Sequence, residues 1–307
     1  MDVIEIAKRI EALSLWEAAG RYNWLVKPKG TVLPYFFTLE NTKDDKVRHR
    51  IHFLEGWNVF HSAVMARANR DFGYYTAIGE YPQFQVAYLD DSQILFRRCD
   101  AGYMPRELTG EEETLLGKLM WESYGIMLQL EDTPDLPCKY APENAMFGRI
   151  ESPEEGDWHD EGVPIPQPPP YTERVSLRKD AIEKAKAMGI DAQLKVEVDY
   201  RLMPGWSTAE ARPRAMYLLA AVDASSGRPL VVARTSVSKD VGLKQLWEKM
   251  PALLFGEFVK SGRFPCEIIV NSQRMFRFLR IFCEAVPVKL SIHDQCPVLD
   301  AFMKRAF

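Results

Sequence analysis

The sequence has no long apolar run, few cysteines and few histidines, and each shortage argues against a class of protein. No stretch approaches the ~20 consecutive apolar residues of a membrane helix. The segment Met1-Asp-Val-Ile-Glu-Ile6 carries acids where a signal peptide would be basic. The five cysteines are scattered and contain no CxxC pair, which argues against a disulfide framework and a zinc–thiolate site. We therefore expect a cytoplasmic protein that does not bind membranes.

The common catalytic motifs are also missing, since the chain contains no GxSxG, P-loop, GxGxxG or HExxH pattern. The histidines gather only at His49, His52 and His61. His49 and His52 are three residues apart in an expected strand, so their side chains should point to opposite faces. We therefore expect no metal site at these histidines.

The composition is that of a soluble globular protein. The chain has 307 residues, of which 47% are hydrophobic and 27% charged, and this length allows two domains with separate cores. The net charge of −4 is unevenly spread, because residues 190–307 hold 17 Lys+Arg and 12 Asp+Glu, a net of +5. A mildly basic C-terminal part is compatible with a polyanionic partner, but the excess is too small to require one.

Residues 1–133 are expected to form an α+β domain with a mainly antiparallel sheet. Helical spacing of apolar residues predicts a helix from Asp2 to about Ala19. The capping-box pattern Thr109-Gly-Glu-Glu112 predicts the start of a second helix. Strands are predicted over residues 31–39, 47–54, 74–78, 84–89 and 93–98. Residues 58–69 fit either a strand or a helix.

Residues 134–175 are expected to be a linker, or a strap across one domain. Pro164-Ile-Pro-Gln-Pro-Pro-Pro170 favours an extended conformation, because consecutive prolines cannot form a helix. The preceding segment, Glu151–Glu161, is acidic. It could dock on the candidate arginines of the C-terminal domain, which are named below, and strap the two domains together.

Residues 176–307 are expected to form an α/β domain with a mixed five-stranded sheet. A short helix, residues 176–188, precedes three strands in a row, after which helices and strands alternate. The predicted strands are 194–202, 215–222, 229–234, 266–270 and 288–292, with helices over 243–259 and 273–285. The first three strands should form an antiparallel meander, and helical crossovers should add the last two in parallel.

This order of elements, with the segment Ala221-Val-Asp-Ala-Ser-Ser-Gly-Arg228, resembles the ribonuclease H-like superfamily, the fold of integrase cores. The chain more closely resembles an uncharacterised two-domain bacterial family of domains of unknown function. The C-terminal half carries this resemblance in Tyr217–Gly227, Phe264–Asn271 and Cys296–Asp300. The N-terminal half carries it in Leu54–Trp57, Gly102–Arg106 and Thr109–Glu113. The resemblance implies a ribonuclease H-like C-terminal domain and assigns no activity.

A ribonuclease H-like site uses converging carboxylates to hold two divalent ions. The resemblance implies Asp199, Asn271, and Asp294 or Asp300 as the candidate ligands. The neutral Asn271 should lower the affinity for Mg²⁺ or Mn²⁺. Structural roles are the alternative. Asp199 fits a solvated sheet face, Asn271 with Ser272 fits a helix cap, and Asp300 fits the first turns of the last helix.

Five arginines are candidate binding residues for phosphates or for an acidic partner. They are Arg212, Arg214, Arg274, Arg277 and Arg280. The last three repeat every third residue on one predicted helix, which is also typical of a solvated helix edge.

The sequence thus favours a non-catalytic binding or scaffolding protein that uses a degenerate ribonuclease H-like fold and needs no cofactor. Its partner would be a protein or a nucleic acid. The alternatives are a nuclease dependent on Mg²⁺ or Mn²⁺, acting on phosphodiesters, and a structural subunit of a protein complex.

Overall fold

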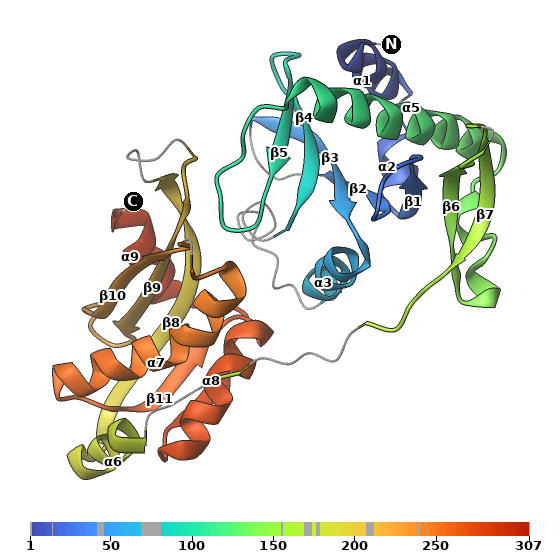
Figure 1. Cartoon of the computed structure of the whole chain (residues 1–307). Coiled ribbons are helices and arrows are strands. Elements are labelled where there is room, and N and C mark those ends of the chain that lie inside the picture. The colour runs from blue at the N-terminus through green and yellow to red at the C-terminus, as the bar shows by residue number, and fades with distance from the viewer. Residues whose placement is uncertain are drawn as a thin grey trace. The chain divides into compact units, whose positions relative to one another are not determined.

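The structure is a computed structural model that describes residues 2–13, 15–41, 46–68, 81–154, 156–168, 174–175, 179–206, 212–238 and 240–306. It contains two sheets, each with its own helices (Figure 1). The chain divides into two compact units. Unit 1 is Met1–Val64, Tyr81–Asp100 and Pro105–Pro169, and unit 2 is Met65–Glu80, Ala101–Met104 and Pro170–Phe307. No helix among the described residues is long and apolar enough to cross a bilayer.

Unit 1 contains a seven-stranded sheet in the order β5-β4-β3-β2-β1-β6-β7. Its strands are β1 (Trp24–Lys27), β2 (Tyr35–Asn41), β3 (Val47–Glu55), β4 (Gln83–Leu89), β5 (Ile94–Cys99), β6 (Ala145–Glu151) and β7 (Trp158–Pro164). Its helical segments are α1 (Val3–Ala12), α2 (Trp16–Ala19), α5 (Gly110–Asp132), η1 (Leu136–Cys138), η2 (Ala141–Glu143) and the part of α3 (Trp57–Ala68) up to Val64. Among the described strands of this sheet only β1 and β6 pair in parallel, so the prediction of a mainly antiparallel sheet is confirmed.

The core of unit 1 lies between one face of this sheet and the helices α1 and α5. Trp24 of β1 stacks on Phe37 of β2 with ring centroids 3.9 Å apart, and its indole donates to Ser123 of α5 at 3.2 Å. At the start of α5, Thr109 accepts from the backbone N–H of Glu112 at 3.3 Å, so the predicted capping box is confirmed.

Several elements of unit 1 differ from the sequence-based predictions. Residues 2–19 form two helices, α1 and α2, in place of one. The segment 58–69, which fits either a helix or a strand, is helical up to Ala68, within α3. The strand β1 was not predicted, because its four residues, Trp24-Leu-Val-Lys27, are too few to show a period. The predicted strand 74–78 lies outside the described residues.

Regular structure also occurs where an irregular linker was expected. Residues 145–151 and 158–164 pair as β6 and β7, and β6 joins β1 through the register Leu25↔Gly148. The sequence does not reveal this, because β7 is acidic and mostly exposed and β6 contains a glycine. A Cβ at Gly148 would lie 2.6 Å from Cγ2 of Val163, so a larger residue there would force this side chain or the strand to shift.

Unit 2 contains a five-stranded mixed sheet in the order β10-β9-β8-β11-β12. Its strands are β8 (Asp191–Trp206), β9 (Ala215–Asp223), β10 (Pro229–Ser236), β11 (Pro265–Val270) and β12 (Lys289–Ile292). Its helices are α6 (Lys179–Met188), α7 (Leu243–Ser261), α8 (Gln273–Ala285) and α9 (Pro297–Ala306). The first three strands are antiparallel, whereas β11 runs parallel to both β8 and β12, as predicted.

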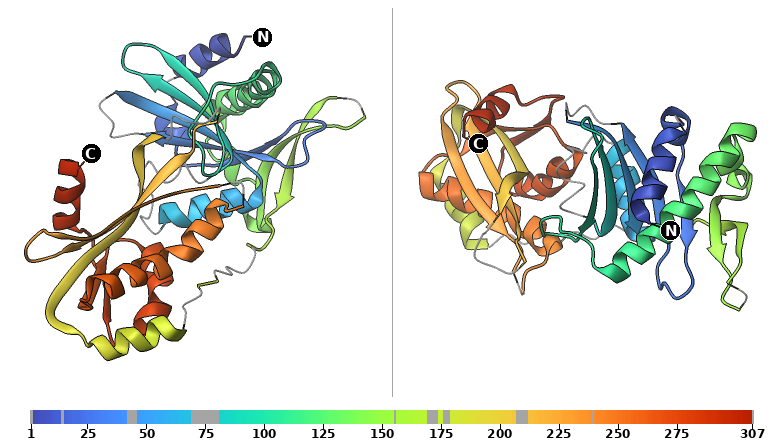
Figure 2. Two further views of the ribbon diagram at one scale, coloured as in Figure 1. Left: turned by 60° about the vertical axis from the view of Figure 1, so that its left-hand side comes forward. Right: turned by 90° about the horizontal axis from the view of Figure 1, so that it is seen from above.

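Both faces of the second sheet are covered. Figure 2 shows α7 and α8 on one side of it and α9 on the other. The larger core contains Val196, Val198 and Leu254, and the smaller core beneath α9 contains Leu218 and Leu299. Because β8 is covered on both sides, two of its polar side chains on the α9 side, Glu197 and Asp199, lie inside the domain.

Candidate functional site

The part of the polar face of β8 that carries Glu197 and Asp199 lies under α9 and is not solvated. Glu197 and Asp199 alternate with Val198, whose side chain enters the main core. Glu197 is 5% exposed and the side chain of Asp199 12% exposed. The structural alternative for Asp199, a solvated sheet face, is therefore wrong. The interpretation fails because α9 packs on this face. The alternation of polar and apolar residues along one strand cannot show whether a helix covers the polar side.

Arg201 joins the two candidate carboxylates Asp199 and Asp300. Its Nε donates to Asp199, and its Nη1 lies 2.8 Å from Oδ1 of Asp300. Asp199 also accepts from the backbone N–H of Tyr200 at 2.7 Å. Burial alone would lower the pKa of Arg201, but the charges of Asp199 and Asp300 outweigh it and raise that pKa. A fixed positive charge therefore lies between the two acids.

A second acid on β8 holds the start of α9. Oε2 of Glu197 accepts from the backbone N–H of Leu299 at 2.8 Å, in the first turn of that helix. This N–H has no intrahelical acceptor, so the carboxylate satisfies it and favours the positive end of the helix. Cys296, just before α9, is fully buried, and burial raises the pKa of its thiol to about 12. Its thiol is thus protonated at neutral pH.

The remaining candidates lie at the ends of β11 and β12. Ser272 caps α8 by accepting from Met275 N at 3.1 Å, and Asn271 directly precedes that cap. Asp294 lies between β12 and α9. Within the described ranges, no hydrogen bond or ion pair joins Asn271 or Asp294 to Asp199. In that same part of the chain, no three His, Cys, Asp or Glu side chains form a group suited to a metal ion.

Glu267 of β11 forms a cluster that the sequence did not reveal. Its carboxylate accepts from Lys289 at 2.7 Å and from Ser291 at 2.6 Å, and it lies 3.0 Å from the Lys195 ammonium. Hydrogen bonds from Lys289, then from Ser291, lower the pKa of Glu267 to about 2. The cluster ties three strands together, because Lys195 lies on β8 and the other two partners on β12.

The five candidate arginines come from α8 and from the segment before β9. Three of these arginines contact an aromatic ring or a backbone carbonyl of unit 2. The guanidinium of Arg274 lies 3.7 Å from the ring centroid of Trp247, and that of Arg212 lies 4.1 Å from the ring of Tyr103. Arg214 donates to the carbonyl of Val237 at 2.9 Å. On the exposed side of α8, Arg280 pairs with Glu284 at 3.5 Å, and Arg277 is exposed one turn earlier.

One face of β2, β3 and β4 in unit 1 is polar yet buried. Its members, each no more than 5% exposed, are Thr38, Arg50, His52, Gln83 and Gln85. Nδ1 of His52 lies 2.8 Å from Gln83, and its Nε2 lies 3.1 Å from Glu40. His49 lies on the other face and stacks on Trp16 at 4.4 Å, so the two histidines do not share a ligand position. Sequence reasoning missed this cluster because polar alternation also describes a solvated face.

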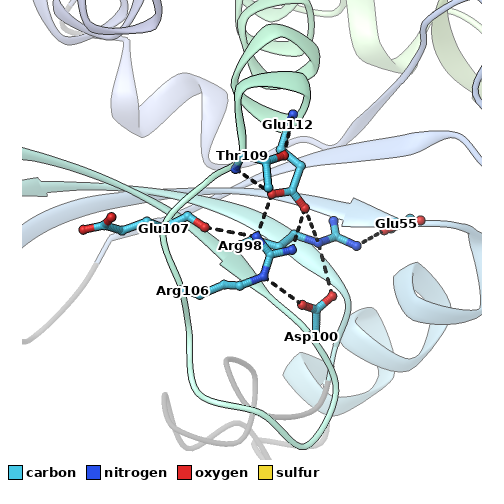
Figure 3. A network of polar contacts seen from close by, with 7 residues as sticks. All are labelled: Glu55, Arg98, Asp100, Arg106, Glu107, Thr109 and Glu112. Atoms are coloured by element: carbon cyan, nitrogen blue, oxygen red, sulfur yellow. Dashed lines mark hydrogen bonds and ion pairs between the residues drawn. The ribbon is translucent and has the colours of Figure 1, made fainter. Parts of the chain in front are cut away.

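A charged network fastens the start of α5 to the sheet of unit 1 (Figure 3). Its charged members are Glu55, Arg98, Asp100, Arg106 and Glu112. Arg106 donates to both oxygens of Glu112 at 2.7 Å, and Arg98 pairs with Glu55 at 2.5 Å. The hydrogen bond from Arg106 holds the pKa of Glu112 at about 2. The network joins the ends of β3 and β5 to α5, which is a structural role.

Comparisons with known proteins add one match. Residues 181–306 match the model of a domain of unknown function (DUF6930). The match lies within unit 2, and it confirms the expectation of an uncharacterised domain in the C-terminal part of the chain. No curated protein and no solved structure matches the chain.

Proposed function

We propose that this protein is a non-catalytic binding module whose C-terminal unit has a degenerate ribonuclease H-like fold. The strand order β10-β9-β8-β11-β12 and the strand directions of unit 2 support this fold assignment, because they are those that the resemblance implies. The observation that carries the proposal is the position of Arg201 between Asp199 and Asp300.

The chemistry of this site does not fit a pair of divalent ions. Such a site needs carboxylates that surround two cations about 4 Å apart. Here one guanidinium is already paired with two of the candidate acids, so a single net negative charge remains for a metal ion, and the nearby positive charge of Arg201 would repel that ion. The third candidate, Asn271, carries no charge. The acids and Arg201 instead hold α9 on the sheet.

The proposal predicts that Mg²⁺ and Mn²⁺ do not raise the melting temperature of the unmodified protein and that it does not cleave DNA or RNA. The Arg201→Gln variant should lose roughly 1–3 kcal/mol of stability, because two half-buried carboxylates lose their cation. Mn²⁺ should restore part of that loss by taking the position of the guanidinium. Thermal shift with and without Mn²⁺ measures both effects, and Lys304→Gln on the exposed part of α9 is the control.

The opposite outcome is equally clear. A Mn²⁺-dependent rise in the melting temperature of the unmodified protein, with nuclease activity that Asp199→Ala abolishes, would establish the nuclease alternative.

The module's partner is proposed to be a protein, since three of the five candidate arginines contact aromatic rings or backbone of unit 2. Salt-sensitive retention on a DNA or RNA column would instead indicate a nucleic acid.

A further inference from the structure

A cleft in unit 1 runs along α5 beside α1, is partly open to solvent and has a volume of about 480 Å³. Pockets that bind small molecules have volumes of roughly 300–1,000 Å³. On α5 the cleft is lined by Gly110, Glu113, Gly117 and Trp121, which recur every three or four residues and so share one helix face. A Cβ at Gly117 would lie 3.4 Å from Val3 of α1, an ordinary contact distance, so α1 and α5 lie close together at this position.

Two tryptophans line this cleft. Trp121 of α5 keeps 38% of its surface exposed, and Trp158 of β7 is half-buried. An indole ring is the strongest aromatic partner for a cation, which is attracted to the negative face of the ring. The cleft therefore offers aromatic surface that the fold of unit 1 leaves accessible.

The charged groups of the cleft are mainly acidic. Asp2, Glu113 and Glu122 line it, against one lysine, Lys118. Lys118 lies 3.5 Å from Glu151, outside the lining, so an acid already balances its charge. In the part of the chain that the structure describes, neither Asp2 nor Glu113 forms an ion pair. The field in the cleft thus favours a cation.

The end of the cleft at the buried Glu122 is also negatively charged. Glu122 is 8% exposed and lies 3.2 Å from Arg149. Arg149 is also paired with Asp160, so two carboxylates share this one guanidinium. Lys118 and Arg149 are each paired with acids, so the carboxylates of the lining leave an excess of negative charge that favours a cationic ligand over an anionic one.

We infer that this cleft binds a small organic cation, an ammonium or guanidinium group on a compact apolar body. The charged group would face the carboxylates of Glu113 and Glu122, and the apolar body would lie against Trp121 and Trp158. This inference concerns unit 1 and does not depend on the proposed function of unit 2.

The test is a titration of the full-length protein with tetramethylammonium, choline and agmatine, followed by calorimetry or ligand-observed NMR. The matched probe is 3,3-dimethylbutan-1-ol, which has the shape of choline without its charge. At least one of the cations should bind. The affinity of the neutral alcohol should be lower than that of choline by a factor of roughly five or more. Absence of binding by all three cations, or equal binding of choline and the alcohol, would overturn the inference.

Two variants locate the binding. Trp121→Leu and Glu113→Gln should each lower the affinity for the cation by roughly fivefold or more, because the first removes an aromatic ring and the second removes a carboxylate. The control is Glu111→Gln, an exposed acid in the same helical turn that does not line the cleft. Circular dichroism confirms that each variant is folded. Unchanged affinity in both cleft variants, or an equal loss in the control, would place binding elsewhere and contradict the inference.

Discussion

Single charged residues decide the chemistry of the second sheet. Asp199 and Asp300 are acids at positions where a metal site is plausible, and Arg201 turns them into an internal ion pair. The sequence shows all three residues but not their contact. Asp300 lies on α9, far along the chain from β8, so only the packing of that helix brings its carboxylate to Arg201. The candidate acids could thus be predicted, whereas their partner could not.

Glu267 provides a residue-scale prediction for pH dependence. Its pKa is about 2 in the folded protein and near 4.5 in the unfolded chain, so its stabilisation is complete above pH 4.5. The stabilisation is lost as the pH falls from 4.5 towards 2. A shift of this size corresponds to about 3 kcal/mol, which the exposure of both lysines reduces to roughly 1–2 kcal/mol.

Glu267→Gln should therefore destabilise unit 2 at pH 7 and have a smaller effect at pH 3. Urea unfolding at the two pH values measures the difference. The exposed Glu284→Gln on α8 serves as control and should show little effect at either pH. An equal loss at pH 3 and pH 7 would mean that the side chain acts through packing and not through its charge.

At the scale of elements, polar alternation along a strand does not show whether its face meets water. Glu197 and Asp199 of β8 and the alternating polar side chains of β2 to β4 are largely removed from water. The same pattern describes a solvated face, and only the position of α9 distinguishes the two on β8. Helix α8, in contrast, was predicted with its bounds of 273 and 285, because its apolar period and its Ser272 cap are local signals.

Glu197 carries the element-scale prediction. Its carboxylate satisfies the N–H of Leu299, so Glu197→Ala leaves that donor without an acceptor beneath α9. The expected cost is about 1–3 kcal/mol. Hydrogen exchange should increase first in residues 297–306, while α8 on the other face keeps its protection. Uniformly faster exchange across unit 2 would show that α9 does not open separately from the sheet.

At the scale of the whole molecule, two separate cores favour two units of independent stability. The cluster around Leu119 belongs to unit 1, and the cluster around Leu254 belongs to unit 2. The division into domains at residues 133 and 176 stays a prediction. In the structure, unit 1 ends at Pro169 and the last segment of unit 2 begins at Pro170, because β6 and β7 belong to the first sheet.

Calorimetry tests the independence of the two cores. Leu119→Ala and Leu254→Ala each remove a fully buried side chain and should each cost about 2–5 kcal/mol. We expect two thermal transitions, with each variant lowering a different one. Leu128→Ala, at a position that is 40% exposed, is the control and should shift neither. Two variants that lower the same single transition would show that the chain unfolds as one cooperative unit.

The sequence by itself determined the order of helices and strands in the C-terminal part, the start of α5 and the mixed character of the second sheet. These features depend on apolar period, turn residues and caps, which act between residues close in the chain. The tertiary structure alone decided that β6 joins β1 and that Arg201 meets Asp300. Both contacts join residues far apart in sequence, and their energy comes from pairing and burial that exist only after the chain has folded.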